Sequence, residues 1–231
     1  MEIKVTWQQQ VTTKFPELAI CIGLIKDIHN GKENETLKKL KRDVYEEVRA
    51  KYDIETLKDN STVRAYRDFY WKLDIDPTKT RPSGEALLRR VLHGDELPNI
   101  STVVDAYNLT SLKTIVPISG FDPDLLTVPF QVRFANNGET FTGIGMTKPI
   151  PLTEKMLVLA DAKQAVCVYP YRDSDATKIT LNSRKALVIA YGAPGISNEY
   201  LKQAAESTLA CISLVSGCTV ETATVFNTNQ Q

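Results

Sequence analysis

Histidine is scarce in this sequence, which has two histidines, four cysteines and no net charge among its 231 residues. Catalysis of the Ser/His/Asp type needs a histidine held beside a nucleophile. His29 follows a strand-like segment in a turn, and His93 stands near the end of an expected helix, so neither has that setting. The cysteines lie in apolar or helical surroundings without the paired spacing of metal ligands. We therefore expect free thiols, no bound metal and no cofactor.

Long apolar runs and phosphate-binding loops are missing as well. No apolar run approaches the roughly 20 residues that cross a bilayer, and the N-terminal residues lack the basic segment and apolar core of a signal peptide. The Gly143-Ile-Gly145 segment is too short for a dinucleotide-binding fingerprint. The 28 basic and 28 acidic side chains balance, which disfavours a protein that wraps DNA. We expect a cytoplasmic protein that contacts neither membrane nor DNA.

Apolar periodicity predicts an α+β fold with a largely helical N-terminal part. Residues 34–52 repeat apolar side chains at helical spacing, and we expect this helix to lie on a sheet. Further helices are expected to start near Asn60, Ser83 and Ser101, and one to end at Gly217. Residues 136–139, Asn-Asn-Gly-Glu, are typical of a hairpin turn. Strands are expected over residues 3–7, 18–25, 115–118, 130–134, 140–144, 156–160, 165–169, 186–191 and 220–226.

The segment of residues 73–94 combines two proline turns with a well-formed helix start. Ser83 offers an N-cap oxygen, and Glu85 places a carboxylate in the first turn. We expect Leu88 and its apolar neighbours to dock this helix against the sheet. The turn presents Lys79 and Arg81 beside free helix N–H groups, which suits an anion. The alternative is a capped junction with solvated charges, and the local pattern alone favours it.

A second group of polar residues stands at strand ends. The Tyr171-Arg172-Asp173-Ser174 segment interrupts an apolar strand abruptly, where a sheet opens toward a pocket. An arginine there suits a carboxylate or phosphate, and a tyrosine offers a flat face. An ordinary surface turn with an Arg–Asp pair is the alternative. The other polar residues of this kind are Asn108, Ser119, Arg133, Glu139 and Thr180.

The order of several short motifs resembles a known family. Residues 76–92, DPTKTRPSGEALLRRVL, precede LPNI at 97–100, VDAYN at 104–108, GFD at 120–122, VRFA at 132–135 and YRDS at 171–174. This series resembles the B3/B4 domain of the phenylalanyl-tRNA synthetase β subunit, and most closely the free-standing proteins built from that domain. It spans about residues 64–191. The resemblance implies a layered β/β/α domain over residues 1–231, with an N-terminal extension at 1–60, the strongest similarity at 61–191 and a C-terminal helix and strand at 192–231.

The resemblance also implies a function. In the synthetase this domain proofreads, by hydrolysing tRNA that carries the wrong amino acid. In this sequence Ser119 occupies the position of the family's histidine, residues 169–173 replace its glycine-rich turn, and its later glutamate falls in apolar residues 187–190. Glu139 or Asp173 is then a candidate for orienting the water. We expect the partner to be tRNA or its aminoacylated end, in a pocket between residues 79–85 and 171–174 that uses Arg81, Arg172 and Asn108. The alternative is a non-catalytic module that binds tRNA or an amino-acid-like small molecule.

Overall fold

The fold is built from two five-stranded sheets, a small two-stranded sheet and a group of helices. The computed structural model describes residues 2–229. None of its helices is both long and apolar enough to cross a membrane. The helices are α1 (Gln9–Lys14), α2 (Glu35–Lys51), α3 (Ser61–Lys72), α4 (Ser83–Leu92), α5 (Thr102–Thr114) and α6 (Asn198–Ser216). The strands are β1 (Val5–Trp7), β2 (Ala19–Lys26), β3 (Ile118–Phe121), β4 (Phe130–Phe134), β5 (Thr140–Phe141), β6 (Ile150–Pro151), β7 (Leu157–Ala160), β8 (Ala165–Val168), β9 (Arg172–Asp173), β10 (Ala186–Tyr191), β11 (Thr219–Val220) and β12 (Thr224–Asn227).

The two sheets have different strand orders. Sheet A runs β1-β4-β7-β8-β9, and sheet B runs β11-β2-β10-β3, with β12 also paired to β2. Among the strand pairs of residues 2–229, the β1–β4 pair is parallel and the others are antiparallel. Strand β10 is buried along its whole length, because it lies inside sheet B and is covered on both faces. Its continuous apolar run is the sequence signature of such a strand.

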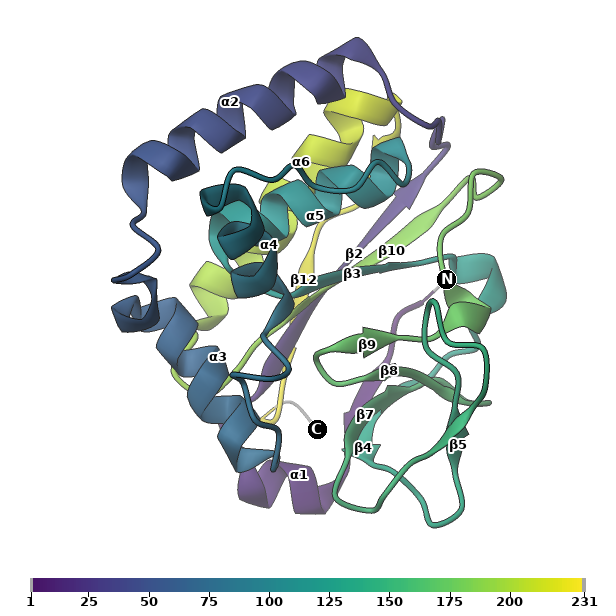
Figure 1. The fold of residues 1–231 in the computed structure, drawn as a ribbon. Helices are drawn as coiled ribbons and strands as arrows, with labels where there is room; N and C mark the ends of the chain where they lie inside the picture. The colour runs from purple at the N-terminus through teal and green to yellow at the C-terminus, as the bar shows by residue number, and fades with distance from the viewer. Residues whose placement is uncertain (1, 230–231) are drawn as a thin grey trace.

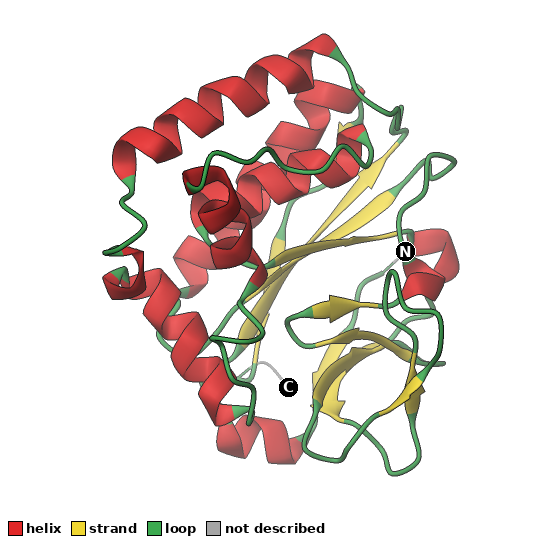
Figure 2. Ribbon diagram, viewed as in Figure 1, coloured by secondary structure: helices red, strands yellow, loops and turns green. Residues whose placement is uncertain are grey.

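The elements stack in layers. Figure 1 shows sheet A on one side of sheet B and the helices α5 and α6 on the other. The colouring of Figure 2 makes the same division clear, with helices gathered along one side of the long strands. Side chains from both sheets and from α5 and α6 share one hydrophobic cluster. This arrangement confirms the predicted α+β class.

Helices α2 and α4 form an outer layer and do not lie on a sheet, so both expected dockings are wrong. Leu88 of α4 is fully buried among side chains of α2, α3 and α5. The N-terminus of α4 approaches the C-terminal end of α5 closely at Gly84, where a Cβ would lie 2.5 Å from the Ile115 carbonyl. Amphipathicity fixes which face of a helix is buried, but it does not say whether a sheet or another helix covers that face.

Helix starts and ends follow the expected signals. Asn60 caps α3, Ser101 caps α5 and Ser197 caps α6 with side-chain oxygens that accept backbone N–H groups. Helix α6 ends at Gly217, whose φ of 58° places it in the left-handed region. The exception is α4, which begins at Ser83 itself, so that Pro82 takes the N-cap position without a side-chain bond.

The Asn-Gly turn does not form a hairpin. Glu139 N–H does bond to the Asn136 carbonyl, and Gly138 has a φ of 77°. The strand before this turn, β4, pairs with β1 and β7, however, whereas β5 after it pairs with β6. The predicted final strand is likewise divided into β11 and β12. Local turn chemistry sets the bend, and non-local pairing decides the partner.

Candidate functional site

Asp173 faces sheet B because of the pairing register of sheet A. Cross-strand partners stand on the same face of a sheet, and one row of partners runs Val132, Leu159, Cys167 and Asp173 through β4, β7, β8 and β9. Leu159 and Cys167 belong to the hydrophobic cluster that both sheets share. The carboxylate of Asp173 therefore continues this inner row at β9, the edge strand of sheet A.

Ser119 meets this carboxylate from the facing sheet. It lies on β3, the edge strand of sheet B, and its hydroxyl donates a hydrogen bond of 2.7 Å to Asp173 Oδ1. Ser119 is 7% exposed, and Asp173 is half-buried. The pair thus joins two edge strands at a place where the interior between the sheets opens toward solvent.

Burial raises the pKa of Asp173 from 3.8 to about 6. The hydrogen bonds from Ser119 and the Cys167 thiol, and the charge of Arg172, oppose this rise without cancelling it. No ion pair within 4.0 Å joins Asp173 to a cation in residues 2–229. The carboxylate is therefore ionised at pH 7 but only weakly compensated, which is typical of functional carboxylates.

Tyr107 of α5 lies beside the pair. Its ring packs against Gly120, where a Cβ would come within 2.7 Å of the ring carbon Cε1. The missing side chain at Gly120 lets the ring approach β3 closely, on the face of the strand opposite to Ser119. Burial, and then the charge of Asp173, raises the pKa of Tyr107, so its hydroxyl stays neutral and can donate a hydrogen bond.

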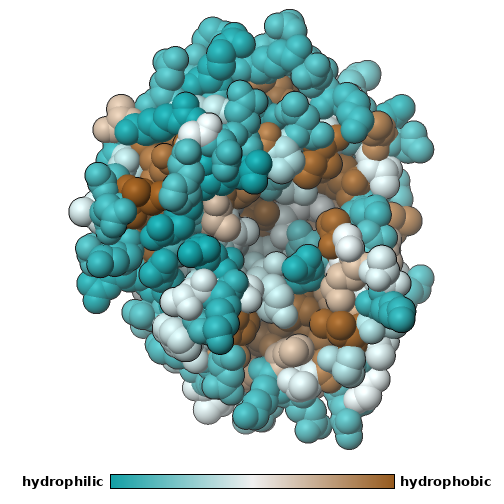
Figure 3. Space-filling view, in the orientation of Figure 1, coloured by the Kyte–Doolittle hydropathy of each residue, from teal (hydrophilic) through white to brown (hydrophobic). Residues whose placement is uncertain are grey.

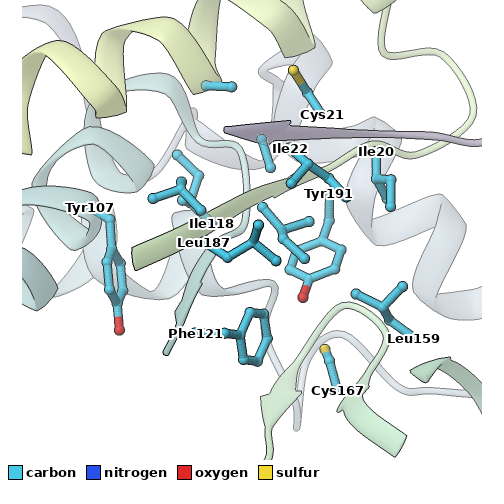
Figure 4. Close-up of a cluster of buried hydrophobic side chains, with 14 of the residues drawn as sticks. Ile20, Cys21, Ile22, Tyr107, Ile118, Phe121, Leu159, Cys167, Leu187 and Tyr191 are labelled. Atoms are coloured by element: carbon cyan, nitrogen blue, oxygen red, sulfur yellow. The ribbon is translucent and has the colours of Figure 1, made fainter. Parts of the chain in front are cut away.

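Tyr191 and Cys167 lie beneath the pair. Figure 4 shows the Tyr191 side chain extending from β10 with its hydroxyl directed toward Cys167. Tyr191 is fully buried, and its hydroxyl has neighbours in Cys167 and Ser119 but no hydrogen-bond partner. A buried hydroxyl without a partner costs about 1–3 kcal/mol. Such a cost at this position points to a polar group that the protein alone does not supply.

The molecular surface is hollowed in this region. Figure 3 shows a depression at the centre of the face, between the helices and sheet A, lined by residues of intermediate hydropathy. In the same orientation, Figure 1 places the ends of β3 and β9 there. A separate cavity of about 140 Å³ lies between residues 73–75 and sheet A and is lined in part by Tyr171 and Val168.

Arg133 and Glu139 lie on the other face of sheet A. Arg133 pairs across the strands with Val158, which packs in the cluster under that outer face. The two terminal nitrogens of Arg133 donate to the Glu139 carboxylate at 2.8 Å each, and these bonds lower the pKa of Glu139 despite its partial burial. The structure therefore separates Glu139 from Asp173, and Glu139 is not part of the Ser119–Asp173 site.

Arg172 also points away from Asp173. It stands opposite Val168, on the outer face of sheet A. Its side chain is exposed, packs against Gly143 and donates to the Ile144 carbonyl at 3.3 Å. The Arg–Asp pair considered as an alternative for this turn is not formed.

Glu85 is held by two arginine side chains of the protein. It is fully buried and accepts hydrogen bonds from Arg67, on α3, and from Arg89, one turn along α4. Burial alone would raise the pKa of Glu85, but the two guanidinium groups hold it below its usual value. Both oxygens of this carboxylate are thus engaged within the helical layer, away from the Ser119–Asp173 pair.

The remaining predicted residues are not gathered at one point. Lys79 and Arg81 are exposed on the loop before α4, and Lys79 lies 3.8 Å from Asp76. Ser83 is half-buried at the start of α4, and Asn108 is half-buried on α5, next in sequence to Tyr107. Thr180 is exposed, and its N–H bonds to Ser183.

Three residues of the site, Tyr107, Cys167 and Tyr191, were not predicted as functional. Each stands in an apolar segment whose pattern is fully explained by burial. Only the pairing of β8 with β9 and of β3 with β10 brings these residues to the site. The β3–β10 pair joins segments far apart in the sequence, so no local pattern indicates it. Within residues 2–229 no three His, Cys, Asp or Glu side chains are grouped to hold a metal ion.

The comparisons with known proteins concern the same region. The model of the B3/4 domain family matches residues 65–212, which cover Tyr107, Ser119, Asp173 and Tyr191. A search of curated protein sequences gives no match.

Among solved structures, an N-terminal fragment of the phenylalanyl-tRNA synthetase β subunit from Pyrococcus horikoshii has a similar fold. The TM-score is 0.50 at 11% identity, over 95% of this chain and 50% of that one, so this chain spans about half of the fragment's length. These findings confirm the resemblance seen in the sequence, and the family match extends over well more than half of the chain. The chain belongs to the B3/4 domain family.

Proposed function

We propose that this chain binds the aminoacylated end of a tRNA in the hollow above Ser119 and Asp173 and hydrolyses the ester, as a proofreading factor acting in a compartment that contains aminoacyl-tRNA. The single observation that carries this proposal is the 2.7 Å hydrogen bond between a half-buried, uncompensated carboxylate and the serine that stands in the position of the family's histidine. The family membership and the fold shared with a synthetase fragment support the substrate class.

The chemistry requires a positioned water and no nucleophilic side chain. The Ser119 proton is directed to Asp173, so the lone pairs of Ser119 Oγ face outward and can accept a hydrogen bond from water. The negative charge behind Ser119 strengthens that acceptor. The water oxygen attacks the ester carbonyl carbon, and the bond from this carbon to the ribose oxygen breaks. One proton of the water goes to the ribose oxygen, so the tRNA leaves with a free hydroxyl and the amino acid leaves as the acid. Positioning of this kind contributes to rate without covalent catalysis.

The test is release of amino acid from tyrosyl-tRNA and phenylalanyl-tRNA that carry the phenylalanine anticodon. We expect the protein to release at least one amino acid faster than the spontaneous rate. Ser119→Ala and Asp173→Asn should each lower that rate about a hundredfold or more, the lower end of what one positioned group contributes. Asp124→Asn removes an exposed carboxylate that pairs with Lys185 on the surface, and it should leave the rate unchanged. Release at the spontaneous rate by the unaltered protein would contradict the proposal.

A second candidate is a non-catalytic module for an amino-acid-like small molecule. The observation in its favour is the negative charge of the site. Asp173 is its central charged group, whereas Arg172, which suits a phosphate, lies on the opposite face of the sheet. Binding of tRNA should weaken steeply as salt rises from 50 to 200 mM, because phosphate contacts release counterions, by about tenfold or more. An affinity for tRNA that stays flat over this range, with small-molecule binding intact, would favour the second candidate.

A further inference from the structure

Asp173 is a carboxylate without a cation. Its oxygen Oδ1 accepts a hydrogen bond of 2.7 Å from the Ser119 hydroxyl, and the Cys167 thiol also donates to the carboxylate. An ionised carboxylate offers about four acceptor positions on its two oxygens, so positions remain for a further donor. A half-buried charge of this kind is costly unless a partner compensates it.

The cations near Asp173 in the chain are already placed elsewhere. Arg172 lies across the strand on the outer face, where it donates to the Ile144 carbonyl. Lys178 bonds to Asp175 at 2.6 Å. Neither can reach the inner face of sheet A without breaking the contact it makes. A cationic ligand would supply the compensating charge.

A second observation indicates a ligand with several N–H donors. The Tyr191 hydroxyl is fully buried beside Ser119 and Cys167 and has no hydrogen-bond partner. It can accept one hydrogen bond from a donor that enters between the sheets. A primary ammonium group has the charge and the three donors that this setting lacks.

We propose that Asp173 binds the free α-ammonium group of the ligand, so that the site takes amino acid esters and amides with an unblocked amine and rejects N-acylated ones. The identity of the ligand as an aminoacyl group rests on the proposed function. The pairing of Asp173 with an ammonium does not require that any ester be hydrolysed.

The direct test uses small molecules and no tRNA. Phenylalaninamide and tyrosinamide, and the N-acetyl derivative of each, are titrated into the unaltered protein at pH 7.0, with chemical-shift changes as the readout. We expect at least one free amide to bind at least tenfold more tightly than its N-acetyl derivative. In Asp173→Asn this preference should fall below threefold. In Asp124→Asn, which removes an exposed carboxylate, the preference should persist.

Three results would overturn the inference. They are equal binding of the free and acetylated amides, unchanged binding of the free amide by Asp173→Asn, and no binding of either amide at millimolar concentration. Because Asp173→Asn removes an uncompensated charge, we expect this variant to fold, and a thermal melt of the same sample checks it.

The inference can be separated from the proposed function with two pairs of RNA substrates. Phenylalanyl-tRNA and N-acetyl-phenylalanyl-tRNA are compared, together with the tyrosyl pair. If the amides bind as expected and no aminoacyl-tRNA is hydrolysed, the inference stands and the proposed function fails. If free and acetylated forms are hydrolysed at equal rates, the proposed function stands and the inference fails.

Discussion

Replacement of Asp173 by asparagine should stabilise the protein above neutral pH. The pKa of Asp173 is raised from 3.8 to about 6, mainly by burial. Between these values the folded state binds a proton that the unfolded state has released, so stability falls as pH rises. The favourable contribution of protonated Asp173 is thus complete below pH 3.8 and is lost once pH passes about 6. Asparagine does not ionise, so the variant does not suffer this loss.

The size of the effect follows from the shift. A rise of the pKa from 3.8 to about 6 corresponds to roughly 3 kcal/mol as an upper limit. Asp173 is partly exposed to solvent, and asparagine can still accept the Ser119 hydrogen bond, so we expect about 1–2 kcal/mol. For a chain of this length, that is a rise in Tm of about 2–8 °C.

The assay is urea unfolding of both proteins at pH 4.5, 6.0 and 8.0. The difference in unfolding free energy should be small at pH 4.5 and largest at pH 8.0, with Asp173→Asn the more stable protein. Asp124→Asn should differ from the parent by less than about 0.5 kcal/mol at pH 8.0, since it alters the surface alone. The argument for an uncompensated carboxylate would be refuted if Asp173→Asn were less stable than the parent at pH 8.0. It would also be refuted if the difference in unfolding free energy did not change with pH.

The helical layer gives three further predictions, each checked by the urea midpoint. Leu88→Asp should cost at least about 3 kcal/mol, because it places an unpaired charge among fully buried side chains, and a midpoint equal to the parent's would show that the packing is misassigned. Gly84→Ala should cost about 1–3 kcal/mol through the 2.5 Å approach to Ile115, whereas Gly31→Ala, with open space around its Cβ, should cost less than about 1 kcal/mol. Glu85→Gln should cost about 3 kcal/mol at pH 7, because it leaves two arginines without their carboxylate. Since the pKa of Glu85 is lowered in the fold, this cost should shrink as pH falls through that pKa, and a cost that grows toward acid would contradict it.

Helices were predicted well because their signals are local. Capping oxygens at Asn60, Ser101 and Ser197 and the left-handed glycine at 217 act within one turn of the helix end. The positions of β4, β7, β8 and β10 were also found, since apolar segments of four to six residues stand out after residue 113, whereas β3 lies at Ile118–Phe121 and not at 115–118, and the short strands β6 and β9 were missed. What the sequence could not provide is the order of strands in the sheets. Pairing joins β4 to β7 and β3 to β10, and no local feature of either strand selects its partner.

The candidate site was predicted with the same limit, because its residues are visible in the sequence but the strand pairing that places them is not. Interpreting residues 171–174 as a turn puts Arg172 and Asp173 side by side as one polar group. The structure instead makes Arg172 and Asp173 a short strand paired with β8. Successive side chains of a strand point to opposite faces, so one ends against Gly143 on the outside and the other against Ser119 within. A single change of backbone state thus replaces the Arg–Asp pair of the alternative interpretation by an exposed arginine on one face and, on the other, a carboxylate bonded to Ser119.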